Sequence, residues 1–266
     1  MRATPAILKF GSILIAFTLA ACGYNVQTSS GKDYIAAIPL PSAMSPGDIE
    51  VQIRAAADIE PILRFPARVG LARVGRENGH LALLPPSAEE AKAWLDLAGD
   101  LGPEFGEFVP VSPLIAAIVS PAQTGSDRTT SLRETVNAIR LTAARQHLEA
   151  VLIYEADATA DSRRNPLSIA NWTIIGAFIV PSRNVKAEGV AQALLIDVRN
   201  GYPYGTIQAN ANDKTIAALF ANEEATQDLS KRVEIAAVQN LTHEAKGLMR
   251  QLKVKLAALD KPVKAP

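Results

Sequence analysis

The residues with the clearest chemical role lie near the amino terminus, where a lone cysteine follows two small residues. The tetrapeptide Leu19-Ala20-Ala21-Cys22 stands behind an apolar run at 10–18 and two basic residues. A positive segment, a short apolar segment and a small-residue junction are the parts of an export signal, and the cysteine offers a thiol for lipid attachment. The apolar run is shorter than the roughly 20 residues that a membrane-spanning helix needs. We therefore expect a signal peptide over 1–21, cleavage before Cys22 and lipidation of Cys22.

The residue after the cysteine indicates where the mature chain goes. Gly23 follows Cys22, whereas many Gram-negative bacteria use Asp at this position to retain a lipoprotein in the inner membrane. Several acyl chains, such as palmitate, anchor stably because each buried methylene contributes about 0.8 kcal/mol. The chain has one cysteine, so its lipidation leaves no thiol for a disulfide. We expect a lipoprotein of the outer membrane on its periplasmic face, with exposure at the cell surface left open.

A second group of chemically suggestive residues is acidic. Glu155, Asp157 and Asp161 come just past a short apolar run at 150–154. Open α/β sheets bind ligands at the carboxyl ends of their strands, where carboxylates could hold a divalent cation or act as acid and base. The interpretation that we favour is a solvated loop rich in turn-forming residues. We expect Asp197 to face solvent as well.

The sequence patterns of common catalytic centres do not occur in the chain. It has no Gly-x-Ser-x-Gly elbow, no His-Glu-x-x-His pair and no Cys-x-x-Cys pair. Its three histidines, His80, His147 and His243, are far apart in the sequence. We therefore predict that the protein is not an enzyme and that it holds no cofactor and no metal.

Charge and composition limit the classes of partner. Removal of the signal takes away Arg2 and Lys9 and leaves 25 basic against 27 acidic residues, a net charge of about −2. A nucleic-acid binder would show a basic stripe, so we expect no nucleic-acid partner. A mature chain of this length fits one large domain, which we place at 45–260, after a flexible tether at 22–44 and before a polar tail at 261–266.

The elements that must position these groups alternate between strand and helix in the first half of the domain. Apolar patterns predict strands at 67–74, 108–111 and 150–154. Capping boxes at Ser87 and Ser131 each have a glutamate three residues later, and they predict helices that begin there. The order is that of a βαβαβ arrangement.

The second half of the domain has the pattern of an antiparallel meander. Strands are predicted at 172–180 and 190–198, and Asn200-Gly201 indicates a hairpin into 204–209. A long amphipathic helix follows at 227–259, with Gly247 as a weak point. The predicted fold class is α/β (α+β), a mixed sheet with a βαβαβ first half, an antiparallel second half and a long carboxy-terminal helix.

Two stretches, at Ala67–Val74 and Trp172–Pro181, resemble the proteobacterial family called rhombotarget lipoproteins, and the similar pattern covers roughly 65–212. Members share a lipobox and segments like RVGLARV and NWTIIGAFIVP. The chain ends in LAALDKPVKAP rather than in that family's glycine-rich sorting tail, so processing by a rhomboid-type protease is not implied. The family has no assigned activity, so the resemblance implies no catalytic residues. More loosely, the element order is similar to periplasmic assembly domains of the curli-secretion-like and TolB-amino-terminal-like kinds, which are binding modules.

Three functions are compatible with these observations. The first is a non-enzymatic binding or assembly module, anchored to the outer membrane, for an envelope protein partner. The second is an oligomeric secretion-channel component that inserts a β-hairpin at 172–198, and a homo-oligomer is compatible with the sequence. The third is a metal-assisted hydrolase that uses Glu155, Asp157 and Asp161. We favour the first, because the catalytic patterns are absent and the terminal helix is long and amphipathic.

Overall fold

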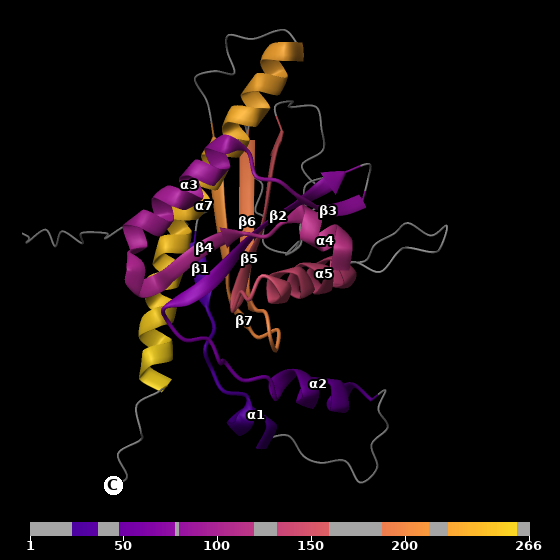
Figure 1. Ribbon diagram of the computed structural model, residues 1–266, viewed down its shortest axis with the longest axis vertical. Coiled ribbons are helices and arrows are strands. Elements are labelled where there is room, and N and C mark those ends of the chain that lie inside the picture. Colours follow the sequence, from indigo (N-terminus) through magenta and orange to yellow (C-terminus); the bar gives the residue numbers. More distant parts are fainter. Residues whose placement is uncertain are drawn as a thin grey trace, which may run out of the picture.

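The computed structural model describes residues 23–36, 48–77, 80–119, 132–159, 188–212 and 223–259. The described strands form one seven-stranded sheet in the order β1-β7-β6-β5-β2-β3, with β4 also paired with β2. Helices α3 and α7 cover one face of this sheet, and α4 and α5 lie on the other (Figure 1). The predicted mixed α/β sheet with a long carboxy-terminal helix is confirmed.

The bounds of the elements are as follows. The strands are β1 Gly23–Val26, β2 Ala67–Glu77, β3 His80–Leu84, β4 Gly106–Pro110, β5 Ala150–Thr159, β6 Glu188–Asp197 and β7 Pro203–Asn212. The helices are α1 Lys32–Ala36, α2 Ile49–Ala57, α3 Ala88–Leu101, α4 Pro113–Val119, α5 Leu132–Arg145 and α7 Glu223–Leu259, and a single 3-10 turn spans Pro103–Phe105.

The first half of the domain is the predicted βαβαβ unit, with one strand added. β2 is parallel to β5 on one side and to β4 on the other. β4 covers only the first part of that second side, and β3 returns antiparallel to cover Arg73–Glu77. The strand that we predicted at 67–74 is longer in the structure, where β2 continues to Glu77. β3 has no alternating pattern, and pairing with β2 makes it a strand.

The second half is the predicted meander. β5 pairs antiparallel with β6, and β6 pairs antiparallel with β7. The hairpin indicated by Asn200-Gly201 is confirmed: Gly201 has φ +79°, a conformation that favours glycine, and its N–H donates to the Asp197 carbonyl at 3.1 Å. The strand predicted at 172–180 lies outside the described residues. β6 is bonded on both sides, so a membrane-inserted hairpin would require it to leave the sheet.

The segment predicted to be a tether is part of the folded domain at its start. β1 begins at Gly23 and pairs antiparallel with β7. Tyr24 packs against α7 at Gly247, where an added Cβ would lie 2.4 Å from the Tyr24 ring. Gly247 is therefore the site of a close approach rather than a weak point, and Lys255 of α7 donates to the Val26 carbonyl at 3.2 Å. The prediction of a tether that begins at residue 22 is wrong, because a four-residue strand at a sheet edge carries too little pattern to be recognised.

Two hydrophobic layers hold the sheet between its helices. The larger layer joins the sheet to α3 and α7, and its members on α7 recur every three or four residues, from Leu229 to Leu256. The smaller layer joins the other face to α5 and includes Val151, Ile153 and Ile139. Figure 1 shows that α7 runs along the whole sheet and that its amino-terminal end projects beyond it. None of the helices in the described part of the chain combines the length and apolar character needed to cross a membrane.

Candidate functional site

Of the three acidic residues singled out in the sequence, the two that the structure describes lie in a strand and not in a solvated loop. Glu155 and Asp157 lie inside β5, and Asp161 lies outside the described residues. Glu155 is buried and accepts a hydrogen bond from the amide of Gln192, its partner on β6. Asp157 is half-buried, and the loss of solvent raises the pKa of its carboxyl group. The predicted loop is wrong here because the strand continues past the apolar run at 150–154 and pairs with β6 to its end.

These two carboxylates do not form a metal centre. They are two residues apart, so they project from the same face of β5. Calcium takes six to eight oxygen ligands, whereas Glu155 binds an amide nitrogen. Among the residues that the structure describes, no group of three or more His, Cys, Asp or Glu side chains could hold a metal ion. The three histidines are not brought together either: His147 follows α5 on one face, His243 is on α7, and the side chain of His80 is not described.

A charged cluster that the sequence did not reveal lies between the sheet, α3 and α7. The guanidinium of Arg73 on β2 contacts Glu90 of α3 at 2.9 Å and Glu234 of α7 at 2.6 Å. Glu90 is almost fully buried; it also accepts the Ser87 N–H in the capping box and, at 3.4 Å, the Tyr154 hydroxyl. Arg73 therefore ties β2 to α3 and α7, and Glu90 adds β5 through Tyr154.

The electrostatics of this cluster indicate a structural role. Burial raises the pKa of Glu234, against the opposing effect of the Arg73 charge. Burial and the neighbouring Glu90 raise the pKa of Tyr154, so its hydroxyl stays protonated as a donor. Every charged member has a partner inside the cluster. Only the Ser87–Glu90 spacing was visible in the sequence, and the capping box that it predicted is present.

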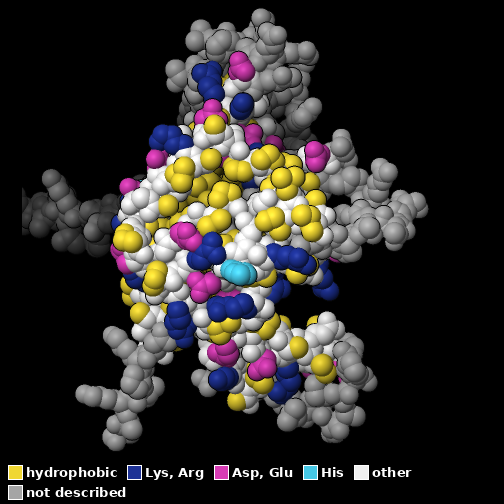
Figure 2. Space-filling view, in the orientation of Figure 1, with side chains coloured by type: hydrophobic (Ala, Val, Ile, Leu, Met, Phe, Trp, Pro, Cys, Tyr) yellow, Lys and Arg dark blue, Asp and Glu magenta, His cyan; other side chains and the backbone are white. Residues whose placement is uncertain are grey.

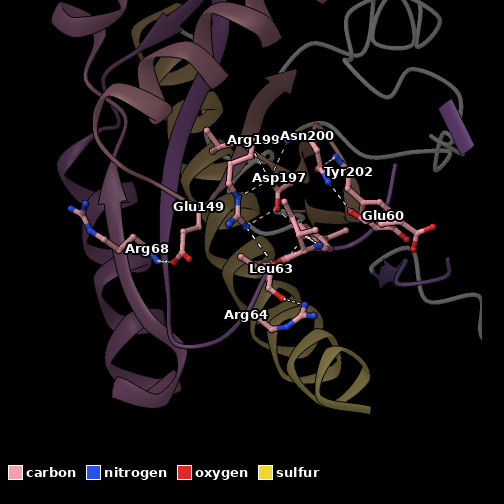
Figure 3. A network of polar contacts seen from close by, with 12 residues as sticks. Glu60, Leu63, Arg64, Arg68, Glu149, Asp197, Arg199, Asn200 and Tyr202 are labelled. Carbon is pink, nitrogen blue, oxygen red and sulfur yellow. Dashed lines mark hydrogen bonds and ion pairs between the residues drawn. The ribbon is translucent and has the colours of Figure 1, made fainter. Parts of the chain in front are cut away.

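A second buried network surrounds Asp197, which we expected to face solvent (Figure 3). Its carboxylate is fully buried and accepts hydrogen bonds from the backbone N–H groups of Arg199 at 2.8 Å and Asn200 at 3.3 Å, and from the Tyr204 hydroxyl at 2.9 Å. The expectation is wrong because the carboxylate closes the β6–β7 turn, and an aspartate that bonds the next backbone N–H groups is a common turn device. These donors and the Arg199 guanidinium, at 3.3 Å, offset the cost of removing the Asp197 charge from water.

The same network fixes the segment before β2. The Tyr204 oxygen accepts the N–H groups of Leu63 at 2.7 Å and Ile62 at 3.1 Å, and the Asn200 amide donates to the Glu60 carbonyl at 2.7 Å. Figure 3 shows Glu60 and Leu63 gathered around the Asp197 turn. Burial and the Asp197 charge raise the pKa of Tyr204, so the hydroxyl remains a donor. This network, too, is structural.

A groove of about 440 Å³ runs between α3 and α7. Four of its charged residues form two ion pairs, one across the groove and one along α3: Lys246 contacts Asp100 at 2.6 Å, and Lys92 contacts Asp96 at 2.6 Å. The Lys246 contact lowers the pKa of Asp100. Because these paired charges are already engaged, we assign the groove no role.

An apolar helix with exposed side chains stands out among the residues that the structure describes. All seven residues of α4 are apolar, yet none of its described side chains is fully buried. Leu114 is 79% exposed and Ile118 is 76% exposed, and their four-residue spacing puts them on one face. Figure 2 shows hydrophobic side chains gathered over α4 and the neighbouring β3, where Leu81 and Leu83 are partly buried. We call Leu81, Leu83, Leu114 and Ile118 the α4 surface.

Comparison with known proteins gives no family for this chain. No protein-family description and no curated protein matches it. Among solved structures, a dodecamer of PelC from Paraburkholderia phytofirmans is similar at 11% identity, covering 68% of this chain and 91% of that one, with a TM-score of 0.29. A HAM1 protein from Coxiella burnetii is similar at 13% identity, covering 72% and 99%, with a TM-score of 0.31. Protein CT253 from Chlamydia trachomatis is similar at 12% identity, covering 72% and 96%, with a TM-score of 0.24. With scores this low, none of the three carries an argument about function.

Proposed function

We propose that this chain is an outer-membrane-anchored lipoprotein whose α/β domain binds a protein partner in the envelope and catalyses no reaction. The sequence pattern that ends at Cys22 supports the anchor. The observation that carries partner binding is the α4 surface, because an apolar helix that leaves large side chains such as Leu114 and Ile118 mostly exposed is costly in water unless something covers it.

The energetics of the α4 surface suit a protein interface. Leu114 and Ile118 stand out from the fold, and full burial of such a side chain stabilises a complex by about 1.5–3 kcal/mol. A few well-buried anchors dominate most interfaces, so two neighbouring residues of this kind can supply the centre of one. α4 carries no charged residue that a partner would have to desolvate.

The experiment that tests partner binding is site-specific photocrosslinking in intact cells. A photoreactive amino acid at Ile118 should give one adduct of defined mass, which the additional change Leu114→Asp should abolish. The matched control is Leu95 on α3, which is 68% exposed on the other side of the sheet and should give no such adduct. Equal adducts from both positions, or an Ile118 adduct that Leu114→Asp leaves intact, would contradict the proposal.

The anchor is tested separately through its one cysteine. The wild-type chain should incorporate labelled palmitate and fractionate with the outer membrane, whereas Cys22→Ser should do neither. If the variant keeps its place in the envelope and takes up the label, lipidation at Cys22 is wrong, whatever the crosslinking shows.

A further inference from the structure

The proposed lipid site is followed directly by the first strand of the folded sheet. β1 begins at Gly23, the residue after Cys22, and consecutive Cα atoms are about 3.8 Å apart. Gly23 is held by pairing with Gln208 of β7, and Tyr24 is held against Gly247 of α7. Acyl chains at Cys22 would therefore place one particular side of the domain on the membrane, namely the side formed by β1 and the carboxy-terminal half of α7.

The exposed surface on that side has a composition that suits a phospholipid headgroup layer. Residues 241–259 of α7 include four Lys or Arg residues and a single acidic residue, Glu244. Large apolar side chains are exposed among them: Val254 is 70% exposed and Leu259 is 50% exposed. Tyr24, next to the anchor, is 41% exposed, and tyrosine favours the boundary between apolar and aqueous layers. We call the exposed residues of this half of α7, centred on Arg250 and Val254, the α7 ridge.

The basic residues around the ridge keep most of their charge available. Lys246 is paired with a carboxylate, that of Asp100. Lys253 and Lys255 donate instead to backbone carbonyls, those of Glu104 and Val26. Lys253 also lies 4.3 Å from the centre of the Phe105 ring. Basic helices with exposed apolar residues bind anionic lipid surfaces through both kinds of contact, and the electrostatic part weakens as salt screens it.

We propose that the α7 ridge lies on the anionic phospholipid surface beside the anchor and fixes the orientation of the domain on the membrane. The proposal rests on lipidation of Cys22, which is part of the proposed function. It adds a second contact, made by side chains of the folded domain. The α4 surface is on the other face of the sheet from α7, so this orientation turns the α4 surface away from the membrane (Figure 1).

The single cysteine makes the test direct. In full-length protein purified from membranes, lipidated Cys22 cannot react with a thiol label, so an environment-sensitive fluorophore marks only an introduced cysteine. One variant carries Val254→Cys on the α7 ridge. The matched control carries Leu114→Cys, which is similarly exposed on the other face. Both are reconstituted into vesicles of phosphatidylethanolamine and phosphatidylglycerol that contain a quencher attached to the lipid acyl chains.

The expected result is a loss of fluorescence from position 254 and none from position 114. Arg250→Glu in the Val254→Cys background should reduce that loss, and so should replacement of the anionic lipid by phosphatidylcholine. If the protein floats with the vesicles but position 254 is not quenched, or both positions are quenched alike, the orientation is wrong and the anchor stands. If the chain takes up two labels and does not float, Cys22 is unmodified, and the anchor and the orientation are both wrong.

Discussion

Removal of the Tyr204 hydroxyl by Tyr204→Phe should lower the free energy of unfolding by about 3 kcal/mol. The hydroxyl donates to the buried Asp197 carboxylate at 2.9 Å and accepts the Leu63 N–H at 2.7 Å. A hydrogen bond to a charged group contributes about 1.5–3 kcal/mol, and a buried donor left without a partner costs about 1–3 kcal/mol. Asp197 keeps two backbone donors in the variant, so we expect the combined loss to lie toward the lower end of the two ranges taken together.

The neighbouring Tyr202 provides a matched control. Its ring lies 5.1 Å from that of Tyr204, and it is also buried, but its hydroxyl donates at 2.8 Å to the neutral carbonyl of Ser29 and not to a charged group. Tyr202→Phe should therefore cost only about 1 kcal/mol. Urea unfolding followed by far-ultraviolet circular dichroism gives both values by linear extrapolation. If the two variants differ by less than about 0.5 kcal/mol, well inside the range for one hydrogen bond, Tyr204 does not organise the turn as we argue.

Three further changes test other parts of the fold. Arg73→Met leaves the buried α3 carboxylate without its cation and should cost about 3–5 kcal/mol in urea unfolding, whereas Glu234→Gln, at a partly exposed member of the cluster, should cost much less. Burial raises the folded-state pKa of Asp157, so the ionised carboxylate lowers the stability of the fold at neutral pH. Asp157→Asn should therefore raise the Tm at pH 7. This gain in Tm should disappear as the pH falls through the raised pKa toward the unfolded-state pKa of about 3.9. Gly247→Ala should speed amide hydrogen exchange in β1 despite the better helix propensity of alanine, because the new Cβ would clash with the Tyr24 ring. In a Tyr24→Ala background that ring is absent, so the same Gly247→Ala change should leave the exchange rates of β1 unaltered.

The elements that the sequence predicts well carry their signal locally. The capping box at Ser87 marks the start of α3 because both of its hydrogen bonds form within one helical turn. The Asn200-Gly201 pair predicts the β6–β7 hairpin because the backbone conformation there requires glycine. The long helix follows from apolar residues at helical spacing over many turns. Each of these features can be recognised without knowing what packs against it.

The features that escaped prediction depend on residues far apart in the chain. β1 is a strand because it pairs with the edge of β7, although Gly23 and its partner Gln208 are 185 positions apart in the sequence. The Arg73 cluster joins four elements, and no local sequence pattern predicts that one arginine will form ion pairs with carboxylates from two helices. The hydrogen bonds of Asp197 to the turn could have been predicted, since an acidic residue directly before a turn often accepts hydrogen bonds from the backbone of that turn. Its burial depends on Tyr204 and on the segment at 60–64, which only the fold brings together.

The loss of the expected tether changes what an anchor at Cys22 would do. A flexible linker over 22–44 would have a root-mean-square end-to-end distance of roughly 25 Å, by the square-root scaling of Gly-rich chains, and the domain could move that far from the bilayer. With β1 paired from Gly23 onward, that freedom shrinks to about the length of one residue. The distance between the membrane and the α4 surface is then set by the thickness of the sheet and its helices. A partner that binds α4 would accordingly have to approach the membrane-bound domain from the periplasmic side, because residues 23–26 next to the anchor are a paired strand and not a linker.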